Sequence, residues 1–415
     1  MAARGQHCRR SHRRDDACAP ATGREILHAG TEVTKINRHG SRTGWRSFLL
    51  LAFLFLICAP ASAQEYFRED LRVPMPLAGP RGLQALFVRP AEPGRYPLVV
   101  FSHGTPRDAE ARLKMSPYGS LPVAMEFVRR GYAVAIVMRR GYGTSGGDYT
   151  EGVACERDGN FTASGLTAAA DIRAAFDFFS KRADVDPNIM IAVGESAGGF
   201  SSIALSSVAP QGLVAVISFA GGRGSTGPYQ ICQQEKLFAA FANYGRTSRV
   251  PTLWIYAAND NFFEPRVAKR FHESFTGTGG MAEFIAHPAH GENGHNLVYR
   301  GISLWTPYVD DFLRKHNLPR RAVLLPPKVS VLPAPPNLSP SGLRSFQDFL
   351  NAGPNKAFAV SPRGAYGWRA GQNTKENAIE SALDNCRKYA SDCALYIVND
   401  EVVTRVSPAA PGSSR

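Results

Sequence analysis

The 415-residue sequence has no apolar run long enough to cross a membrane. Its most hydrophobic stretch, Phe48–Ile57, is about half of the ~20 residues that a spanning helix needs. The chain also lacks a stripe of basic side chains interleaved with aromatic ones, and close to half of its net charge of +13 lies before residue 64. We therefore expect no nucleic-acid partner.

The apolar stretch has the pattern of a secretory signal peptide. Arg42 and Arg46 precede it, and Ala61-Ser62-Ala63 follows it as a small-residue cleavage site. We predict cleavage near Ala63 and export to the periplasm or the extracellular space, with no stable membrane insertion afterwards. A lipid-modified Cys58 is the alternative, which Ile57 disfavours because a small residue is expected there.

Cysteine is scarce, with seven residues in the chain, three of them before residue 64. Neither the remaining cysteines nor the histidines have a ligand spacing such as CxxC or HxxxH, so the sequence implies no metal and no organic cofactor. Four cysteines in an oxidising compartment suggest two disulfides. Cys386 and Cys393 are close in sequence and form the first expected pair, and Cys155–Cys232 follows by elimination. Four buried thiols are the alternative.

Short apolar runs alternate with longer amphipathic stretches between residues 96 and 317. Strands are expected at 96–102, 132–138, 188–193, 213–219, 251–257 and 281–286. Helices are expected at 122–130, 163–181, 197–207, 265–275 and 304–315. The strands are apolar throughout, as in sheets covered on both faces. The pattern predicts an α/β fold with a doubly wound, mostly parallel sheet, and segments 71–74 and 83–88 predict an antiparallel hairpin at its edge.

Residues 318–340 contain seven prolines and no helical periodicity, which predicts a semi-rigid linker. Residues 341–415 then predict a small α+β domain. Its expected helices are 343–350 and 374–389, and its expected strands are 357–360, 366–369 and 394–398. Burial alone is marginal at this size, so a Cys386–Cys393 bridge would have a structural purpose. The expected domains are thus 1–63 (leader), 64–317 (catalytic), 318–340 (linker) and 341–415.

A Gly-x-Ser-x-Gly pattern lies at Gly194–Gly198, between an expected strand and an expected helix. A strand-to-helix turn of this kind holds a nucleophilic serine in a strained conformation and requires small residues two positions before and after it. Ser196 would also lie at a helix N-terminus, which favours developing negative charge. A second match surrounds Ser145, but no helical pattern follows it, so Ser145 is expected in a loop at the pocket rim.

A serine nucleophile needs a histidine as base and an acid that orients the histidine. In chains with such a turn, the acid follows the serine in the sequence, and the histidine follows the acid. Asp260 stands just after the expected strand 251–257, with Glu264 as the reserve acid. Three histidines in the next loop compete for the role of base: His287, His290 and His295. His287 abuts the strand end and is expected to be structural. We prefer His295 over His290 because it lies just before the closing helix.

The oxyanion of an acyl-transfer reaction needs two backbone N–H donors. Ala197 supplies one through its place in the turn. The loop after strand 96–102 should supply the other, and Thr105 is its natural donor because Pro106 has no N–H. We expect His103 to hydrogen-bond the loop rather than to act as a base.

Four features together resemble α/β hydrolases of the dienelactone-hydrolase and prolyl-oligopeptidase-like kind: Pro97–Gly104, the Gly194–Gly199 turn, Asp260 and Gly294-His295. The resemblance covers about residues 65–317 and implies the α/β-hydrolase fold. Dienelactone hydrolases usually carry cysteine as the nucleophile, so Ser196 points to esterase-like chemistry. The segment 357–398 resembles small Cys-paired modules of exported bacterial proteins.

We therefore expect a serine hydrolase that cleaves a small-molecule carboxylic ester through Ser196, His295 and Asp260 and an acyl-enzyme. A secreted serine peptidase is the first alternative, disfavoured because no β-propeller pattern accompanies the catalytic segment. A non-catalytic binding module is the second. The pattern does not predict an oligomeric state.

Two long insertions, 139–165 and 221–249, are expected to cover the active site. Each contains one cysteine of the Cys155–Cys232 pair, so a disulfide would tie the two segments over Ser196. Four aromatic residues of the insertions are candidates for the pocket lining: Tyr142, Tyr149, Phe161 and Tyr229.

Overall fold

The computed structural model describes residues 66–327 and 330–403. The predicted signal peptide and its cleavage site lie outside the described residues. No helix within the described ranges is both long enough and apolar enough to span a membrane.

An eight-stranded sheet forms the centre of the larger part, in the order β1-β2-β4-β3-β5-β6-β9-β10. Its strands are β1 Tyr66–Val73, β2 Leu83–Pro90, β3 Tyr96–Ser102, β4 Ala133–Val137, β5 Val185–Glu195, β6 Leu213–Phe219, β9 Thr252–Ala257 and β10 Ala282–His287. β1, β2 and β4 pair antiparallel, and all pairs from β4 to β10 are parallel. The predicted mostly parallel sheet with an antiparallel edge hairpin is confirmed.

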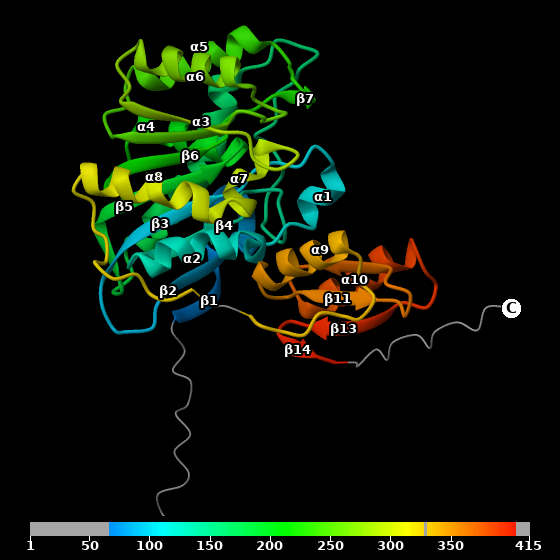
Figure 1. Ribbon diagram of the computed structural model, residues 1–415. Helices are drawn as coiled ribbons and strands as arrows, with labels where there is room; N and C mark the ends of the chain where they lie inside the picture. Colours follow the sequence, from blue (N-terminus) through cyan, green and yellow to red (C-terminus); the bar gives the residue numbers. More distant parts are fainter. Residues whose placement is uncertain (1–65, 328–329, 404–415) are drawn as a thin grey trace, which may run out of the picture. The chain divides into compact units, whose positions relative to one another are not determined.

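Helices cover both faces of this sheet (Figure 1). α3 Phe161–Phe179, α4 Ala197–Val208, α5 Gln234–Gly245 and α6 Pro265–Thr276 pack on one face, and α2 Leu121–Arg129, α7 Leu297–Arg300 and α8 Ile302–Lys315 pack on the other. β3 contributes to both cores: Leu98 and Val100 face the first group, and Val99 and Phe101 face the second. Because every second residue points to the same face, a strand with helices on both sides has to be apolar throughout.

The loops at the carboxyl ends of the central strands contain short elements of their own. α1 Ala109–Leu113 follows the loop after β3, and its N-terminus is capped by Asp108, whose carboxylate accepts from two backbone N–H groups. β7 Ser225–Gly227 and β8 Gln230–Ile231 form a small antiparallel pair after β6.

Only part of the second predicted insertion, 221–249, is available to cover the active site. Its later half is the helix α5, in which Leu237, Phe241 and Tyr244 are buried in the core with exposures of at most 1%. The helices expected from the sequence do not include this one. The signal for it is the 3–4-residue spacing of these apolar side chains.

A second, four-stranded antiparallel sheet lies in residues 340–402, with the order β12-β11-β13-β14. Its elements are α9 Pro340–Asn351, β11 Ala357–Val360, β12 Tyr366–Arg369, α10 Lys375–Arg387, β13 Ala394–Val398 and β14 Glu401–Val402. β11 alternates between two cores: Phe358 and Val360 pack with α9, and Ala357 and Ala359 pack with α10. The expected α+β composition of this segment is present, and the division of the chain into four segments stays a prediction.

Both expected disulfides are formed, Cys155–Cys232 and Cys386–Cys393. Residues 318–327 and 330–339 contain no helix or strand. The first of these stretches is held to α2, because Arg321 and Leu325 donate backbone N–H groups to the carbonyls of Arg130 and Arg129.

Candidate active site

Ser196 occupies the tight turn between β5 and α4. Its φ of 55° and ψ of −121° are a strained conformation for a residue with a side chain. A Cβ at position 194 would lie 2.3 Å from the backbone of Gly198, and a Cβ at position 198 would lie 2.0 Å from the carbonyl oxygen of Ser102. The two glycines are therefore required, since strand, helix and the loop after β3 meet at this point.

His295 and Asp260 come together across the ends of β9 and β10. The imidazole Nδ1 lies 2.9 Å from Asp260 Oδ2 and 3.1 Å from Oδ1, and both side chains are buried. Asp260 is itself fixed, because its Oδ1 accepts the backbone N–H groups of Phe262 (2.7 Å) and Phe263 (3.0 Å). Nδ1–H thus donates to a positioned carboxylate, which leaves Nε2 free to accept a proton.

The pKa of His295 is raised above its usual value. Burial alone would lower it, but the hydrogen bond and the charge of Asp260 outweigh that effect, and the charge of Glu195 adds to them. The ring is also packed against Phe262, with 4.3 Å between the ring centroids. The surroundings therefore favour the imidazolium form that arises when the histidine takes a proton.

The other expected histidines make different contacts. His290 donates its backbone N–H to Asn259 Oδ1 (2.8 Å), and its carbonyl accepts from Asn259 Nδ2. His287 makes a 2.7 Å hydrogen bond from Nδ1 to the carbonyl of Pro288. Glu264 immediately precedes α6. The described contacts thus bring His295, and not His290 or His287, to Asp260.

The loop after β3 passes directly beside the start of α4, as expected for an oxyanion loop. His103 donates from Nδ1 to the carbonyl of Gly104 (2.7 Å), and its Nε2 accepts the backbone N–H of Arg139 (3.2 Å). Burial, followed by the charge of Arg139, lowers its pKa to about 3, so the ring stays neutral. His103 fits the expected structural role in this loop.

A pocket of about 540 Å³ lies over Ser196, within the range usual for small-molecule sites. The catalytic candidates Thr105, Ser196, Ala197 and His295 all line it. Of the four aromatic residues expected to line it, only Tyr149 does; Phe262, Phe263 and Tyr299 supply the other rings. Tyr142 and Phe161 are buried in the core instead, and Tyr229 is 60% exposed.

Ser145 is placed differently from the expectation. It does not line this pocket but is buried, donating to the carbonyl of Met138 (2.7 Å) and accepting the N–H of Gln84 (2.8 Å). Its hydroxyl thus joins the loop after β4 to β2, and no strand-to-helix turn surrounds this second Gly-x-Ser-x-Gly pattern.

Glu195 is a residue of this site that the sequence reasoning missed. Its Oε1 lies 3.4 Å from His295 Nε2, and burial raises its pKa. The carboxylate is wedged against the oxyanion loop, since a Cβ at position 104 would lie 2.3 Å from Glu195 Oε2. Its signal in the sequence was a charged residue that closes a strand after the apolar run 189–193, directly before the serine.

Three further charged residues were also missed: Arg139, Glu151 and Arg223. All are buried, and they pair with one another beneath the loop after β3. Arg139 follows an apolar strand, which is a usable signal. Glu151 and Arg223 lie in irregular segments, and their pairing spans 72 positions, so nothing local predicts it.

Comparison with known proteins gives one family match. The family model of X-Pro dipeptidyl-peptidase (S15 family) matches residues 81–240. No curated protein matches the sequence.

Several solved structures are similar in part of the chain. Esterase Pf2001 of Pyrococcus furiosus has 16% identity and a TM-score of 0.42, over 60% of this chain and 90% of that one. Esterase 2 of Thermogutta terrifontis has 18% identity and a TM-score of 0.44, over 63% and 96%. The acylaminoacyl peptidase of Pyrococcus horikoshii has 15% identity and a TM-score of 0.45, over 62% and 43%.

These similarities are distant, so the fold is assigned from the sheet topology and the local geometry of this chain. The mixed sheet has helices on both faces, and a strained serine lies between β5 and α4. Together these two features define the α/β-hydrolase fold. The family match covers the same region, from β2 to α5. The chain therefore has the α/β-hydrolase fold.

Proposed function

We propose that the protein hydrolyses carboxylic esters, with Ser196 as nucleophile, His295 as general base and acid, and Asp260 as the group that orients the histidine. The observation that carries the proposal is the buried 2.9 Å hydrogen bond from His295 Nδ1 to Asp260 Oδ2, made at the pocket that Ser196 lines. It fixes the tautomer in which Nε2 can take a proton.

In the proposed reaction, Ser196 Oγ attacks the ester carbonyl while His295 Nε2 removes its proton. The negative oxygen accepts hydrogen bonds from the N–H groups of Thr105 and Ala197. Collapse of the tetrahedral intermediate expels the alcohol, which takes the proton from His295, and leaves an acyl-enzyme. Water then repeats the sequence and releases the acid and Ser196.

The test is Ser196→Ala assayed on short p-nitrophenyl esters. We expect kcat/KM to fall by at least about 10³-fold, because the remaining site offers only binding and oxyanion contacts. His290→Ala is the matched control and should keep its activity, whereas His295→Ala should not. Turnover by Ser196→Ala at the wild-type rate would refute the assignment, and a wild-type protein that no fluorophosphonate labels would favour a binding module.

An amide substrate is the second candidate, and the family match to X-Pro dipeptidyl-peptidase over residues 81–240 favours it. The same triad can cleave either bond. The discriminating assay compares an X-Pro p-nitroanilide with p-nitrophenyl acetate on one preparation. Preference for the ester by more than about 100-fold in kcat/KM supports esterase function, and the reverse supports a peptidase.

We also propose that the protein acts outside the cytoplasm after cleavage near Ala63. The two disulfides support this, because such bonds form and persist in oxidising compartments. The mass of the protein purified from the periplasm or medium should correspond to a chain that begins at Gln64. A purified protein that retains residues 1–63 would contradict the proposal.

A further inference from the structure

Arg139, Glu151 and Arg223 form a buried ion cluster beside the active site. Arg139 binds Glu151 through two nitrogens, Nε to Oε2 (2.6 Å) and Nη2 to Oε1 (2.9 Å), and Arg223 Nη2 binds Oε1 (3.0 Å). The three side chains are 1%, 4% and 6% exposed. Charges so fully removed from water are retained only where they are paired and hydrogen-bonded, and two arginines share one carboxylate here.

One side of the cluster holds the loop that carries Thr105. Arg139 Nη1 donates to the carbonyl of His103 (2.7 Å) and to Ser102 Oγ (2.7 Å). Tyr142 lies between the cluster and the loop: its hydroxyl donates to Glu151 Oε1 (2.6 Å) and lies 2.7 Å from Thr105 Oγ1. The loop is therefore fixed on both sides of Gly104, the residue with the greatest backbone freedom in it.

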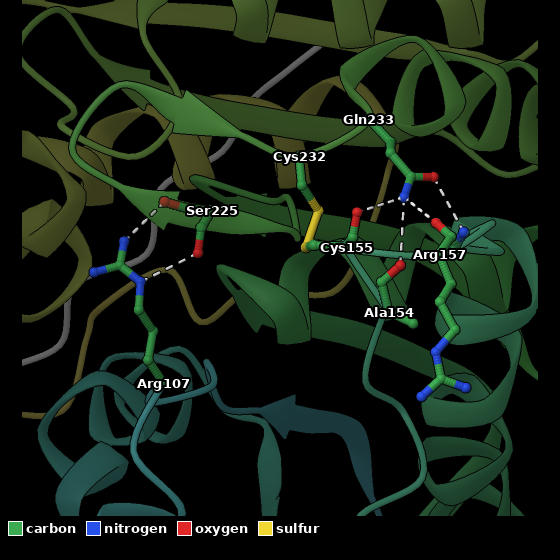
Figure 2. Close-up of a disulfide and its surroundings, with 8 residues drawn as sticks. Arg107, Ala154, Cys155, Arg157, Ser225, Cys232 and Gln233 are labelled. Carbon is green, nitrogen blue, oxygen red and sulfur yellow. Dashed lines mark hydrogen bonds between the residues drawn. A yellow bond between two sulfur atoms is a disulfide. The ribbon is translucent and has the colours of Figure 1, made fainter.

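The other side of the cluster ties together the two segments above the pocket. Arg223 Nη1 donates to the backbone carbonyl of Glu151 (2.8 Å), which joins the segment after β6 to the segment before α3. The Cys155–Cys232 disulfide joins the same two segments a second time, as Figure 2 shows. Beside it, Gln233 Nε2 donates to backbone carbonyls of the 154–157 stretch, including that of Cys155 at 2.8 Å.

We propose that Glu151 is a positioning residue for the oxyanion hole: through Arg139 and Tyr142 it holds the Thr105 N–H where negative charge develops, and through Arg223 it links that donor to the disulfide-bridged segments. The inference rests on the proposed function. It assigns a catalytic purpose to a group that does not line the pocket. A donor contributes to catalysis only while it is held in place for the transition state, so loosening this loop should reduce kcat rather than substrate binding.

The first experiment compares Glu151→Gln with Asp171→Asn. Asp171 makes the neighbouring buried ion pair, with Arg140 Nε at 2.7 Å, and it does not touch the oxyanion loop. Both variants should lower the melting temperature, since each leaves arginine charge unpaired. We expect only Glu151→Gln to lower kcat on p-nitrophenyl esters, by about 10²-fold with KM within about twofold. Glu151→Asp should recover part of the loss.

The second experiment covers the case in which Glu151→Gln does not fold. Tyr142→Phe keeps every ion pair and removes only the hydroxyl between Glu151 and Thr105. We expect a roughly tenfold lower kcat for Tyr142→Phe. Thr105→Val also removes the direct contacts of Oγ1 with Glu151 Oε1 (3.3 Å) and Arg139 Nη2 (3.4 Å), so its loss should be at least as large. The double variant should lose no more than Thr105→Val, because the tyrosine hydroxyl acts on the loop through Thr105. Additive losses in the double variant, or a folded Glu151→Gln or Tyr142→Phe with wild-type kcat, would overturn the inference.

A third measurement separates this inference from the proposed function. The second-order rate of fluorophosphonate labelling reports Ser196 and the oxyanion hole without an ester substrate. A wild-type protein that is not labelled refutes the proposed function. A wild-type protein that is labelled, with equal rates in the folded variants, refutes only the role of Glu151; slower labelling of Glu151→Gln and Tyr142→Phe, but not of Asp171→Asn, supports it.

Discussion

His295 lies between two carboxylates, and this arrangement sets the chemistry at the residue scale. Asp260 accepts from Nδ1, and Glu195 lies 3.4 Å from Nε2, the nitrogen that faces the nucleophile in the proposed reaction. The two carboxylates differ in their surroundings. Asp260 accepts two backbone N–H groups, whereas burial raises the pKa of Glu195. Asp260 is thus suited to orienting the imidazole ring, and Glu195 is suited to adjusting the pKa of His295.

Asp260→Asn tests the orienting role. The amide keeps the shape of the side chain but no longer selects the tautomer with a proton on Nδ1, so we expect kcat/KM for p-nitrophenyl esters to fall by about 10³–10⁴-fold. Circular dichroism should stay that of the wild type. Retention of more than about a tenth of the activity in a folded variant would argue against Asp260 as the acid.

Glu195→Gln tests the tuning role through pH. The base is active when neutral, and the negative charge of Glu195 helps to raise the pKa of His295. Removing that charge should lower the histidine pKa, so the acidic limb of the kcat/KM profile should move to lower pH. Glu195→Asp, which keeps the charge, is the control and should shift the limb less. An unmoved limb in a folded Glu195→Gln would show that the contact does not act on the histidine.

At the scale of elements, the segments above the pocket are held by covalent and ionic links between parts distant in sequence. The Cys155–Cys232 bond joins residues 77 positions apart, whereas Cys386–Cys393 spans 7 positions and joins the end of α10 to the residue before β13. The longer closed loop restricts the unfolded chain more strongly, so the two bonds should differ in their effect on stability.

Replacing each pair by serine gives a matched comparison. In the chain-entropy model the double variant of Cys155 and Cys232 should lose about 4.5 kcal/mol of unfolding free energy, and that of Cys386 and Cys393 about 2.4 kcal/mol. Denaturant unfolding with and without reductant measures both. Only the first variant should also raise KM for esters, because Cys155 lines the pocket. An equal KM effect from the second pair would contradict this assignment.

At the scale of the whole molecule, the described chain has separate hydrophobic cores. The sheet of 340–402 has its own core around Phe358, which contacts Phe346, Phe349 and Tyr366. Lys356 strengthens this part by donating from its buried Nζ to the carbonyl of Leu350 (2.9 Å) near the C-terminus of α9. Every residue that lines the pocket over Ser196 lies between Gly104 and Tyr299.

Phe358→Ala should therefore destabilise one part and spare the other. Truncating a fully buried phenylalanine costs about 3–5 kcal/mol, which we expect to appear as an earlier transition of the C-terminal part in calorimetry. Ester turnover below that transition should stay within about twofold of the wild type. A parallel loss of kcat would show that the C-terminal part supports the active site.

Local residue patterns were enough to predict most of the helices and strands and the candidate site residues. The apolar strands specified a covered parallel sheet, because side chains alternate between two buried faces. The Gly-x-Ser-x-Gly pattern between a strand and a helix selected Ser196 as the candidate nucleophile, because such a turn requires small residues at positions 194 and 198. The expected chain order of acid and histidine in this fold selected Asp260 and His295 as candidates. The closeness of Cys386 and Cys393 in the sequence, with Cys155 and Cys232 left over, predicted both disulfides.

Which groups distant in sequence come into contact became clear only from the folded chain. It brought His295 rather than His290 to Asp260, placed Glu195 beside the imidazole, and buried Glu151 between two arginines. Tyr142, which was expected to line the pocket, instead links Glu151 to Thr105. Such contacts depend on how loops from different strands pack at one edge of the sheet, and no local pattern of residues encodes that packing.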